Sequence, residues 1–565
     1  MGECYGRSMS DVDRISDHFV DRIAALHPIA ATMMGVAGHD DQMTDFSPDG
    51  IAERTALTRS TLHQLGNVEI ESERDRVARD VMVDEAELGL ALDDAGERLR
   101  DLNIMHSPLQ MIRQVFDLVP TETVEHWEAI AARLALVPQG LDGYRTTLQA
   151  GAEQGLVAAQ RQAQACARQA DTWGGLDNGG RGFFQQYVEQ FDSSSIHEPG
   201  LAQRLAAEAQ RADQAYATFG RFLVEEYLPV ASESDAVGAD RYQLWARMFN
   251  GIELDLHETY DWGWSELHRI EHAMGSVGDR ILPGQPIPDV IHHLEHDPTR
   301  SIEGVDEFRA WLQDLLDSTV ADLDGTHFDI PDPVKQVEAM IAPPGGAAAM
   351  YYTGPSEDFS RPGRTWYPTL GKTRFPLWGE VSIAYHEGVP GHHLQIAQVR
   401  YLADTLTRFQ RVLAGSSGHA EGWALYAERL MGELGYLDDP AYELGMLRAQ
   451  AMRAVRVVVD IGLHLQLRIP SDERYLPGET WTPEIALPFV IERSHFPADF
   501  MASEVDRYLG WPGQAISYKV GERVWLAARD AVKAREGAAF DLKEFHRRAL
   551  DLGPMGLAQL QRELV

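Results

Sequence analysis

The sequence predicts a mostly α-helical protein with a small β-sheet insert, and two observations lead to this fold class. Apolar residues recur at three- and four-residue spacings over most of the chain, as they do on the buried face of amphipathic helices. The pattern changes between residues 331 and 380, where short apolar or aromatic runs alternate with Pro- and Gly-rich breaks. We therefore expect a helical N-terminal lobe at 1–330, a β insert at 331–380 and a helical C-terminal lobe at 381–565.

Each lobe contains several segments with a clear helical period. In the N-terminal lobe the helices are expected at residues 12–25, 54–65, 75–90, 124–136, 201–227, 250–278 and 299–323. In the C-terminal lobe they are expected at 380–389, 392–406, 418–434, 441–467, 483–490, 498–509, 513–536 and 542–552. The insert is expected to form strands at 337–342, 347–353 and 364–370, with a turn-forming break at 343–346.

Composition narrows the class of protein. The chain has 87 Asp+Glu against 50 Lys+Arg, a net charge of −37, which argues against binding to nucleic acid or to an anionic membrane surface. The acidity favours solubility, and steering of cationic substrates is the alternative. Cys4 and Cys166 are too few for a disulfide framework. Because neither a signal peptide nor an apolar run of about 18 residues is found, we expect a cytoplasmic protein.

A His-Glu pair at 386 and 387 is the first indication of a metal site. In the motif His-Glu-x-x-His, two histidines four residues apart share one helical face and bind one zinc ion, while the glutamate activates a water molecule. Here the position of the second histidine is occupied by Pro390, and the next histidines are His392 and His393. The sequence therefore departs from the usual spacing by two or three residues.

On a straight helix neither histidine could join His386 at one metal ion. Six residues turn the helix by roughly 240°, and seven residues rise by about 10.5 Å, whereas Zn–N bonds are about 2.0–2.1 Å. Pro390 lacks the amide hydrogen that continues a helix, and Gly391 tolerates unusual backbone angles. We expect a bulge at these two residues that returns His392 to His386. His393 is the alternative second ligand.

The third ligand is expected from the following helix. Glu421 lies in the first turn of the predicted helix 418–434, beside Gly422, which would leave room for a metal or substrate. Glu428 lies seven residues further on the same face and could orient a histidine from behind. A histidine pair next to a proline kink can also be a buried structural or capping feature, so this alternative stays open. His257, His268 and His272 are expected to be surface or capping residues.

Three segments of the C-terminal half resemble the bacterial DUF885 family. They are His-Glu-x-x-Pro-Gly-His-His at 386–393, Glu-Gly-Trp-Ala-Leu-Tyr-Ala-Glu at 421–428 and Pro-Gly-Gln-Ala-x-Ser-Tyr-Lys-x-Gly at 512–521. This family is grouped with gluzincin-type zinc peptidases, whose metal ligands are two His and one Glu. The resemblance implies a two-lobed, zinc-peptidase-like fold with a deep cleft and one Zn²⁺ per chain, with His386, His392 and Glu421 as ligands.

The implied function is hydrolysis of short peptides by a metal-activated water. Glu387 would act as the general base, and Tyr518 is the candidate donor to the oxyanion, with a packed interface tyrosine as the alternative. Two other functions stay open: a metal-dependent hydrolase of a non-peptide amide or ester, and a non-catalytic peptide-binding relative that has lost the metal. The retained Glu387 weighs against the second of these, because a peptide binder needs no general base.

Further residues are candidates for substrate contact. An edge strand around Tyr351 and Tyr352, together with residues 360–363, could align a peptide backbone by β-addition. Four polar residues at helical spacing favour a buried ion network over a substrate clamp; they are Arg453, Arg456, Asp460 and His464. Arg456 or Arg493 could nevertheless hold the carboxylate at the C-terminus of a peptide.

Overall fold

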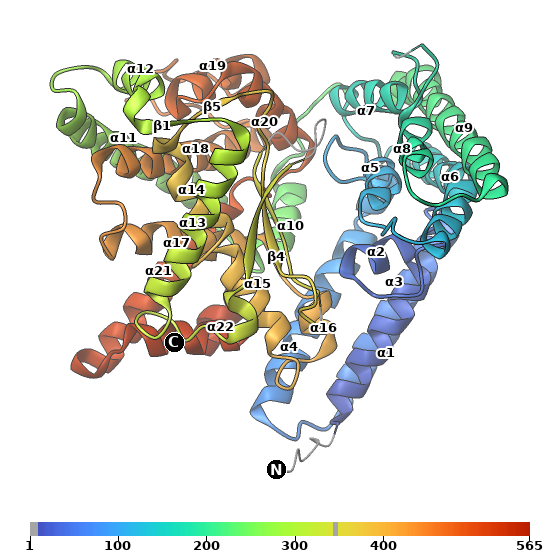
Figure 1. The fold of residues 1–565 in the computed structure, drawn as a ribbon, viewed down its shortest axis with the longest axis horizontal. Helices are drawn as coiled ribbons and strands as arrows, with labels where there is room; N and C mark the ends of the chain where they lie inside the picture. Colours follow the sequence, from blue (N-terminus) through green and yellow to red (C-terminus); the bar gives the residue numbers. More distant parts are fainter. Residues whose placement is uncertain (1–8, 178, 343–348, 357) are drawn as a thin grey trace. The chain divides into compact units, whose positions relative to one another are not determined.

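The computed structural model describes residues 9–177, 179–342, 349–356 and 358–565, and these residues are mostly helical with small sheets (Figure 1). The predicted fold class is confirmed in this coarse form. Cys4, the predicted break at 343–346 and the first two residues of the predicted strand 347–353 lie outside the described residues.

The chain forms two compact units. Unit 1 comprises Met1–Val237 with Leu509–Trp511, and unit 2 comprises Gly238–Tyr508 with Pro512–Val565. The predicted lobes met at residue 330 instead. Residues 238–330 belong with the C-terminal half because the long helix α11 packs against α18, the central helix of unit 2.

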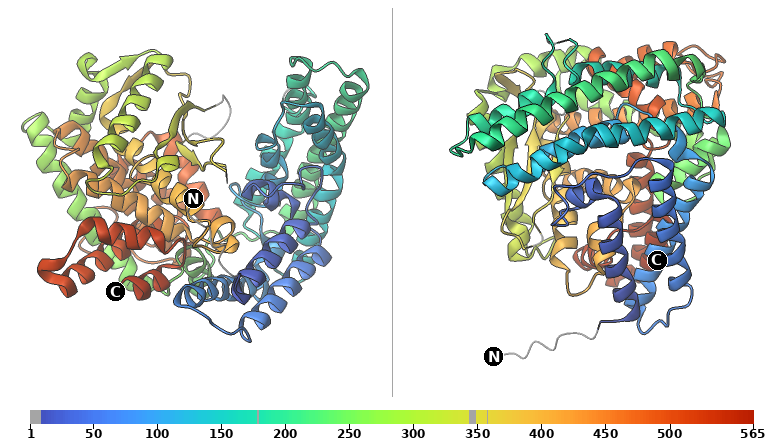
Figure 2. Two further views of the ribbon diagram at one scale, coloured as in Figure 1. Left: turned by 60° about the horizontal axis from the view of Figure 1, so that its bottom comes forward. Right: turned by 90° about the vertical axis from the view of Figure 1, so that its right-hand side faces the viewer.

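The described residues of unit 1 form helices and contain no named strand. Its buried core contains many aromatic side chains, among them Trp127, Tyr216 and Phe219, and the long helices α6 and α9 pack side by side around them (Figure 2). Thr123 caps the start of α6 by accepting a hydrogen bond from the backbone amide of His126. The helices of unit 1 are α1 Asp11–Leu26, α2 Pro28–Met34, α3 Pro48–Leu65, α4 Glu73–Asp94, α5 Pro108–Gln114, α6 Val124–Glu153, α7 Gln160–Trp173, α8 Phe183–Asp192 and α9 Pro199–Phe222.

Unit 2 surrounds helix α18 with further helices. The side chains of α18 are buried along most of its length, which fits its run of valine, leucine and alanine residues. The helices are α10 Ala239–Asn250, α11 Leu256–Ile281, α12 Ile287–His296, α13 Val305–Leu323, α14 Glu380–Glu387, α15 His392–Tyr401, α16 Arg408–Val412, α17 Ser417–Glu433, α18 Pro440–Leu465, α19 Pro483–Ser494, α20 Ala498–Gly510, α21 Ser517–Glu536, α22 Leu542–Asp551 and α23 Leu557–Leu564, of which the last two residues of α20 belong to unit 1.

The strands of unit 2 form two small sheets; β1 precedes α13, and β2 to β5 lie between α13 and α14. In the first sheet β4 lies between a parallel β2 and an antiparallel β3, and in the second β1 pairs with β5 in antiparallel fashion. Helix α13 packs on this region through Phe308, Leu312 and Leu316 (Figure 1). The strands are β1 Ser301–Glu303, β2 Val337–Ile341, β3 Tyr351–Thr353, β4 Gly363–Tyr367 and β5 Arg374–Pro376.

The three strands predicted in the insert correspond to β2, β3 and β4, each with shifted ends. Strands β1 and β5 were missed, because each has only three residues and the two are about 70 positions apart in the sequence. A pairing of this kind leaves no local period for a sequence pattern to reveal.

Candidate metal centre

The connection between α14 and α15 brings two histidines together. Helix α14 ends at Glu387 and α15 begins at His392, so the helix stops and restarts where a bulge was expected. The Val389–Pro390 peptide bond is cis, and the amide of Gly391 donates to the carbonyl of Tyr385 over 3.0 Å. The turn therefore folds back onto the end of α14. As a result, the ring centroids of His386 and His392 are 4.7 Å apart.

Gly391 is required by this close return of the chain. A β-carbon at Gly391 would lie 2.0 Å from the carbonyl oxygen of His386 and 2.4 Å from that of Tyr385, both of them backbone atoms that cannot move aside. Helix α17 holds the turn from the other side, because Trp423 donates its indole N–H to the carbonyls of Pro390, at 2.9 Å, and Gly391, at 3.3 Å.

Replacing Gly391 by alanine is expected to lower the free energy of unfolding by about 3 kcal/mol, because the added methyl group overpacks the turn against backbone. Urea unfolding of the two proteins measures this. Gly432→Ala is the matched control: Gly432 lies in helix α17, where an added β-carbon meets nothing closer than 3.8 Å, so stability should be unchanged or slightly higher. Equal unfolding of Gly391→Ala and wild type would contradict the described turn.

Three potential ligand atoms converge beside this turn. The Nε2 atoms of His386 and His392 lie 3.4 Å and 3.5 Å from Oε2 of Glu421, and the ligand atoms of the three residues lie within 4.8 Å of one another. Both histidines are buried, and Glu421 is largely buried. Two atoms bound tetrahedrally to one zinc ion at about 2.1 Å are about 3.4 Å apart, so the spacing of these atoms fits a metal ion.

The hydrogen bonds of the three residues also fit a cation. Oε2 of Glu421 is buried and receives no well-directed hydrogen bond from the described part of the chain, although two imidazole nitrogens lie near it. Burial acts to raise the pKa of Glu421, but His386 and His392 outweigh it and hold that pKa well below its usual range. The carboxylate is therefore ionised, and its oxygen lacks the partner that a metal would supply.

Glu428 supports His386 from behind. Glu428 is fully buried. Its Oε1 accepts a hydrogen bond from Nδ1 of His386 at 2.8 Å and lies 3.3 Å from Nη2 of Arg453. Its Oε2 accepts a hydrogen bond from the hydroxyl of Ser382. Burial acts to lower the pKa of His386, but Glu421 and Glu428 outweigh it and raise that pKa to about 9. A proton on Nδ1 leaves Nε2 as the atom that faces Glu421. Nδ1 of His392, in contrast, has no partner among the described residues.

Replacing Glu428 by glutamine is expected to weaken zinc binding by roughly 10–100-fold, because an outer carboxylate of this kind orients the histidine and raises its basicity. Calorimetric titration of the metal-free protein with zinc at fixed pH measures the change. Glu433→Gln is the control, since Glu433 lies on the same helix but is partly exposed and paired with Arg529 at 2.7 Å. An unchanged zinc affinity in Glu428→Gln would rule out the supporting role.

His393 has a different environment from its neighbour. It is fully buried, its Nε2 donates to the carbonyl of Val334 at 2.7 Å, and its Nδ1 accepts from the hydroxyl of Tyr352 at 3.0 Å. Burial lowers the pKa of His393 to about 4. Because both ring nitrogens already have partners, His393 has no free ligand atom, and the structure brings His392 rather than His393 to His386 and Glu421.

The two residues with predicted chemical roles lie next to this group. Glu387 is buried at the end of α14, and its charge acts to raise the pKa of His386. Tyr518 lies in the first turn of α21, and its ring centroid is 4.5 Å from Cζ of Arg456 and 5.8 Å from Cζ of Arg453. Burial and the charge of Glu421 raise the pKa of Tyr518, so its hydroxyl keeps its proton. Tyr518 therefore packs against two arginines and lies close enough to Glu421 for the carboxylate charge to raise its pKa.

Gly422 has another role from the one expected. A β-carbon there would lie 2.4 Å from Cα of Gly521, so this glycine allows α17 and α21 to cross closely rather than leaving room for a metal or substrate. The close crossing brings Tyr518 on α21 to the helix that carries Glu421. Among the described residues, the group of His386, His392 and Glu421 is the one that could hold a metal ion.

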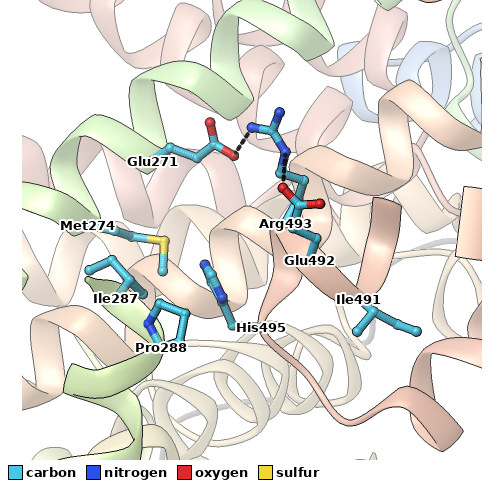
Figure 3. Close-up of a pocket in the computed structure, with 8 residues that line it drawn as sticks. All are labelled: Glu271, Met274, Ile287, Pro288, Ile491, Glu492, Arg493 and His495. Carbon is cyan, nitrogen blue, oxygen red and sulfur yellow. Dashed lines mark hydrogen bonds and ion pairs between the residues drawn. The ribbon is translucent and has the colours of Figure 1, made fainter. Parts of the chain in front are cut away.

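Three other polar candidates from the sequence have partners outside this group; they are His268, Arg493 and Asp460. His268 pairs with Glu473 at 3.0 Å. Arg493 pairs with Glu271 at 2.6 Å and lines a cavity of about 540 Å³ to which none of the three potential ligands contributes (Figure 3). Asp460 accepts from the hydroxyl of Tyr242 at 2.6 Å, so it belongs to a buried network, the arrangement that its helical spacing favoured.

A family model described as "Bacterial protein of unknown function (DUF885)" matches residues 28–564. The chain belongs to the DUF885 family. Two solved structures are similar to this DUF885 protein over 98% of its length and 99% of their own. One is a lipoprotein candidate from Colwellia psychrerythraea, with 25% identity and a TM-score of 0.83. The other is a lipoprotein candidate of unknown function from Shewanella oneidensis, with 16% identity and a TM-score of 0.72.

Among curated proteins, none matches the sequence significantly. Within the described residues, no helix of this DUF885 protein combines the length and the apolar character that crossing a bilayer requires.

Proposed function

We propose that this DUF885 protein is a zinc-dependent peptidase that hydrolyses short peptides. The observation that carries the proposal is the convergence of His386, His392 and Glu421, with Glu387 beside them. Two imidazoles and one carboxylate suit zinc, and three protein ligands leave a position open for a reacting group. The two-lobed, zinc-peptidase-like arrangement with a cleft belongs to the same proposal.

The residues divide the chemistry among them. Zinc, held by His386, His392 and Glu421, would polarise the peptide carbonyl and activate a water molecule. Glu387 takes the proton from this water and passes it to the leaving amine. Tyr518 keeps its phenolic proton and donates a hydrogen bond to the developing oxyanion. Glu428 keeps Nδ1 of His386 protonated, so that Nε2 stays available as a ligand.

The proposal is tested on full-length protein purified without chelator. Metal analysis should give one zinc per chain, and a library of dipeptides and tripeptides read by mass spectrometry should show cleavage that chelator abolishes and zinc restores. Protein with zinc that cleaves no peptide but hydrolyses a simple amide or ester would support the non-peptide hydrolase. Protein that binds peptides without metal and cleaves none of them would support the non-catalytic relative.

The cellular compartment stays a prediction. The sequence favours the cytoplasm, whereas the two similar solved proteins are called lipoprotein candidates. Fractionation of cells that produce the native protein decides between a cytoplasmic and a membrane-attached form. The proposed peptidase chemistry is the same in both.

A further inference from the structure

We infer that Arg453 and Arg456, which both lie against the Tyr518 ring, form a binding site for the terminal carboxylate of a peptide. The inference rests on the proposed peptidase function and names its substrate class: short peptides with a free C-terminus, cleaved within about three residues of it. The two arginines lie three positions apart on α18, so they share one face of that helix.

The donors of Arg453 are only partly used. Its Nη2 contacts Glu428 at 3.3 Å, but its Nε and Nη1 are buried and find no acceptor anywhere in the described part of the chain. The residue is almost fully buried, with an exposed fraction of 6%. A buried guanidinium with unpaired N–H groups is unfavourable by itself, and a carboxylate that accepts them removes the penalty.

Arg456 adds a second cation with donor capacity left over. Its Nε and Nη2 donate to Glu504, at 3.1 Å and 2.7 Å, while no described residue accepts a hydrogen bond from its Nη1. Glu504 is shared, because Arg507 also donates to it through Nε at 3.1 Å and Nη2 at 2.9 Å. One carboxylate therefore serves two arginines, so its single negative charge cannot neutralise both of them.

The ion pairs around Arg456 are short of negative charge. Two buried arginines share one buried glutamate, which leaves one positive charge in excess; the members are Arg456, Arg507 and Glu504. Uncompensated buried charge favours binding of an ion of the opposite sign. An anionic ligand fits this surplus, whereas a cationic one does not.

The position of Arg453 relative to the proposed metal ligands sets the distance between the bound terminal carboxylate and the cleaved peptide bond. Nη2 of Arg453 lies 3.4 Å from Nδ1 of His386, so a carboxylate on Arg453 is held within roughly 10 Å of the ligand group, the extended length of about three residues. Tyr518, the proposed oxyanion donor, packs on both arginines, so the carboxylate site lies beside a group with a proposed catalytic role.

The test compares each peptide of a tripeptide library as the free acid and as the C-terminal amide. Wild-type zinc enzyme should hydrolyse the acids with at least tenfold higher kcat/KM than the amides, mainly through KM. In Arg453→Gln this ratio should fall to about one. The ratio is the informative quantity because Arg453 also supports Glu428, and any loss of metal lowers both rates equally. Equal rates for acids and amides in wild type would overturn the inference and leave the peptidase proposal standing.

Two control variants separate binding from support of the metal. Glu428→Gln should slow both reactions and keep the acid-to-amide ratio. Arg493→Gln, which removes an arginine paired with Glu271 on the cavity of Figure 3, should change neither. If Arg453→Gln does not fold, Arg456→Lys takes its place. Lysine keeps the positive charge but cannot bind a carboxylate through two parallel N–H groups, so the acid-to-amide ratio should fall at least threefold.

A binding measurement keeps the test independent of catalysis. Glu387→Gln protein is incubated with a mixture of the same acids and amides, and the bound fraction is identified by mass spectrometry. Acids should be enriched at least tenfold over amides. If Glu387→Gln protein enriches the acids but wild type hydrolyses none of the peptides, the carboxylate site is supported and the peptidase proposal fails. No enrichment would refute the site.

Discussion

Glu387→Gln is expected to lower kcat for peptide hydrolysis by roughly 10²–10⁴-fold, because glutamine cannot accept the proton of the attacking water. The substitution is nearly isosteric, and Glu387 is not among the three potential ligand residues, so zinc content should stay at one per chain. Steady-state kinetics on a peptide from the library, together with metal analysis of the same sample, measures both quantities.

Glu380→Gln is the matched control, because it makes the same substitution at the opposite end of the same helix. Burial raises the pKa of Glu380 to about 7, so this residue is a second carboxyl group with unusual acidity, and it has no part in the proposed chemistry. Its replacement should leave kcat within about threefold of wild type. Full activity in Glu387→Gln would eliminate the glutamate-base mechanism.

His392→Ala and His393→Ala are expected to have opposite effects, although the two residues are adjacent. Loss of His392 removes a proposed ligand atom and should weaken zinc binding by more than the roughly 10–100-fold typical of an outer partner. Loss of His393 leaves the carbonyl of Val334 and the hydroxyl of Tyr352 without their partner, which should lower the free energy of unfolding by about 2 kcal/mol.

Zinc titration and urea unfolding of both variants make the comparison. His393→Ala should keep its zinc affinity within about threefold, and His392→Ala should unfold close to wild type in the absence of metal. If His393→Ala lost zinc while His392→Ala kept it, the metal would be held in another way than the structure indicates. The pair is informative because each variant is the control for the other.

The sequence was sufficient to predict that His386, Glu421 and one of the adjacent His392 and His393 meet at this site. Metal geometry required the chain to break between His386 and the next histidine, and Pro390 and Gly391 indicated where it breaks. The form of the break was not predictable, since the return of the turn depends on Trp423, a residue on another helix. Local pattern alone places a helix end within a few residues but does not reveal which distant side chain holds it.

Residues whose roles depend on distant partners were the hardest to predict. The partners of His393 come from Val334 and Tyr352, 59 and 41 positions away, so its sequence neighbourhood could not distinguish it from His392. Gly422 was assigned to the site because it follows a ligand, yet its neighbour in space is Gly521 on α21. The boundary near residue 330 had the same weakness, because helix-to-helix packing decides which segments form one unit.

Helix α17 carries the proposed ligand Glu421 and, two residues further, Trp423, which holds the turn that positions His392. Helix α17 therefore positions both the carboxylate of Glu421 and the imidazole of His392, and folding fixes the distance between these two groups. A zinc ion bound as proposed would enter a preorganised site, with little reorganisation of the chain on binding. Removing zinc with a chelator should therefore abolish the proposed peptide hydrolysis while the circular dichroism spectrum stays unchanged, in contrast to zinc fingers, which unfold without their metal.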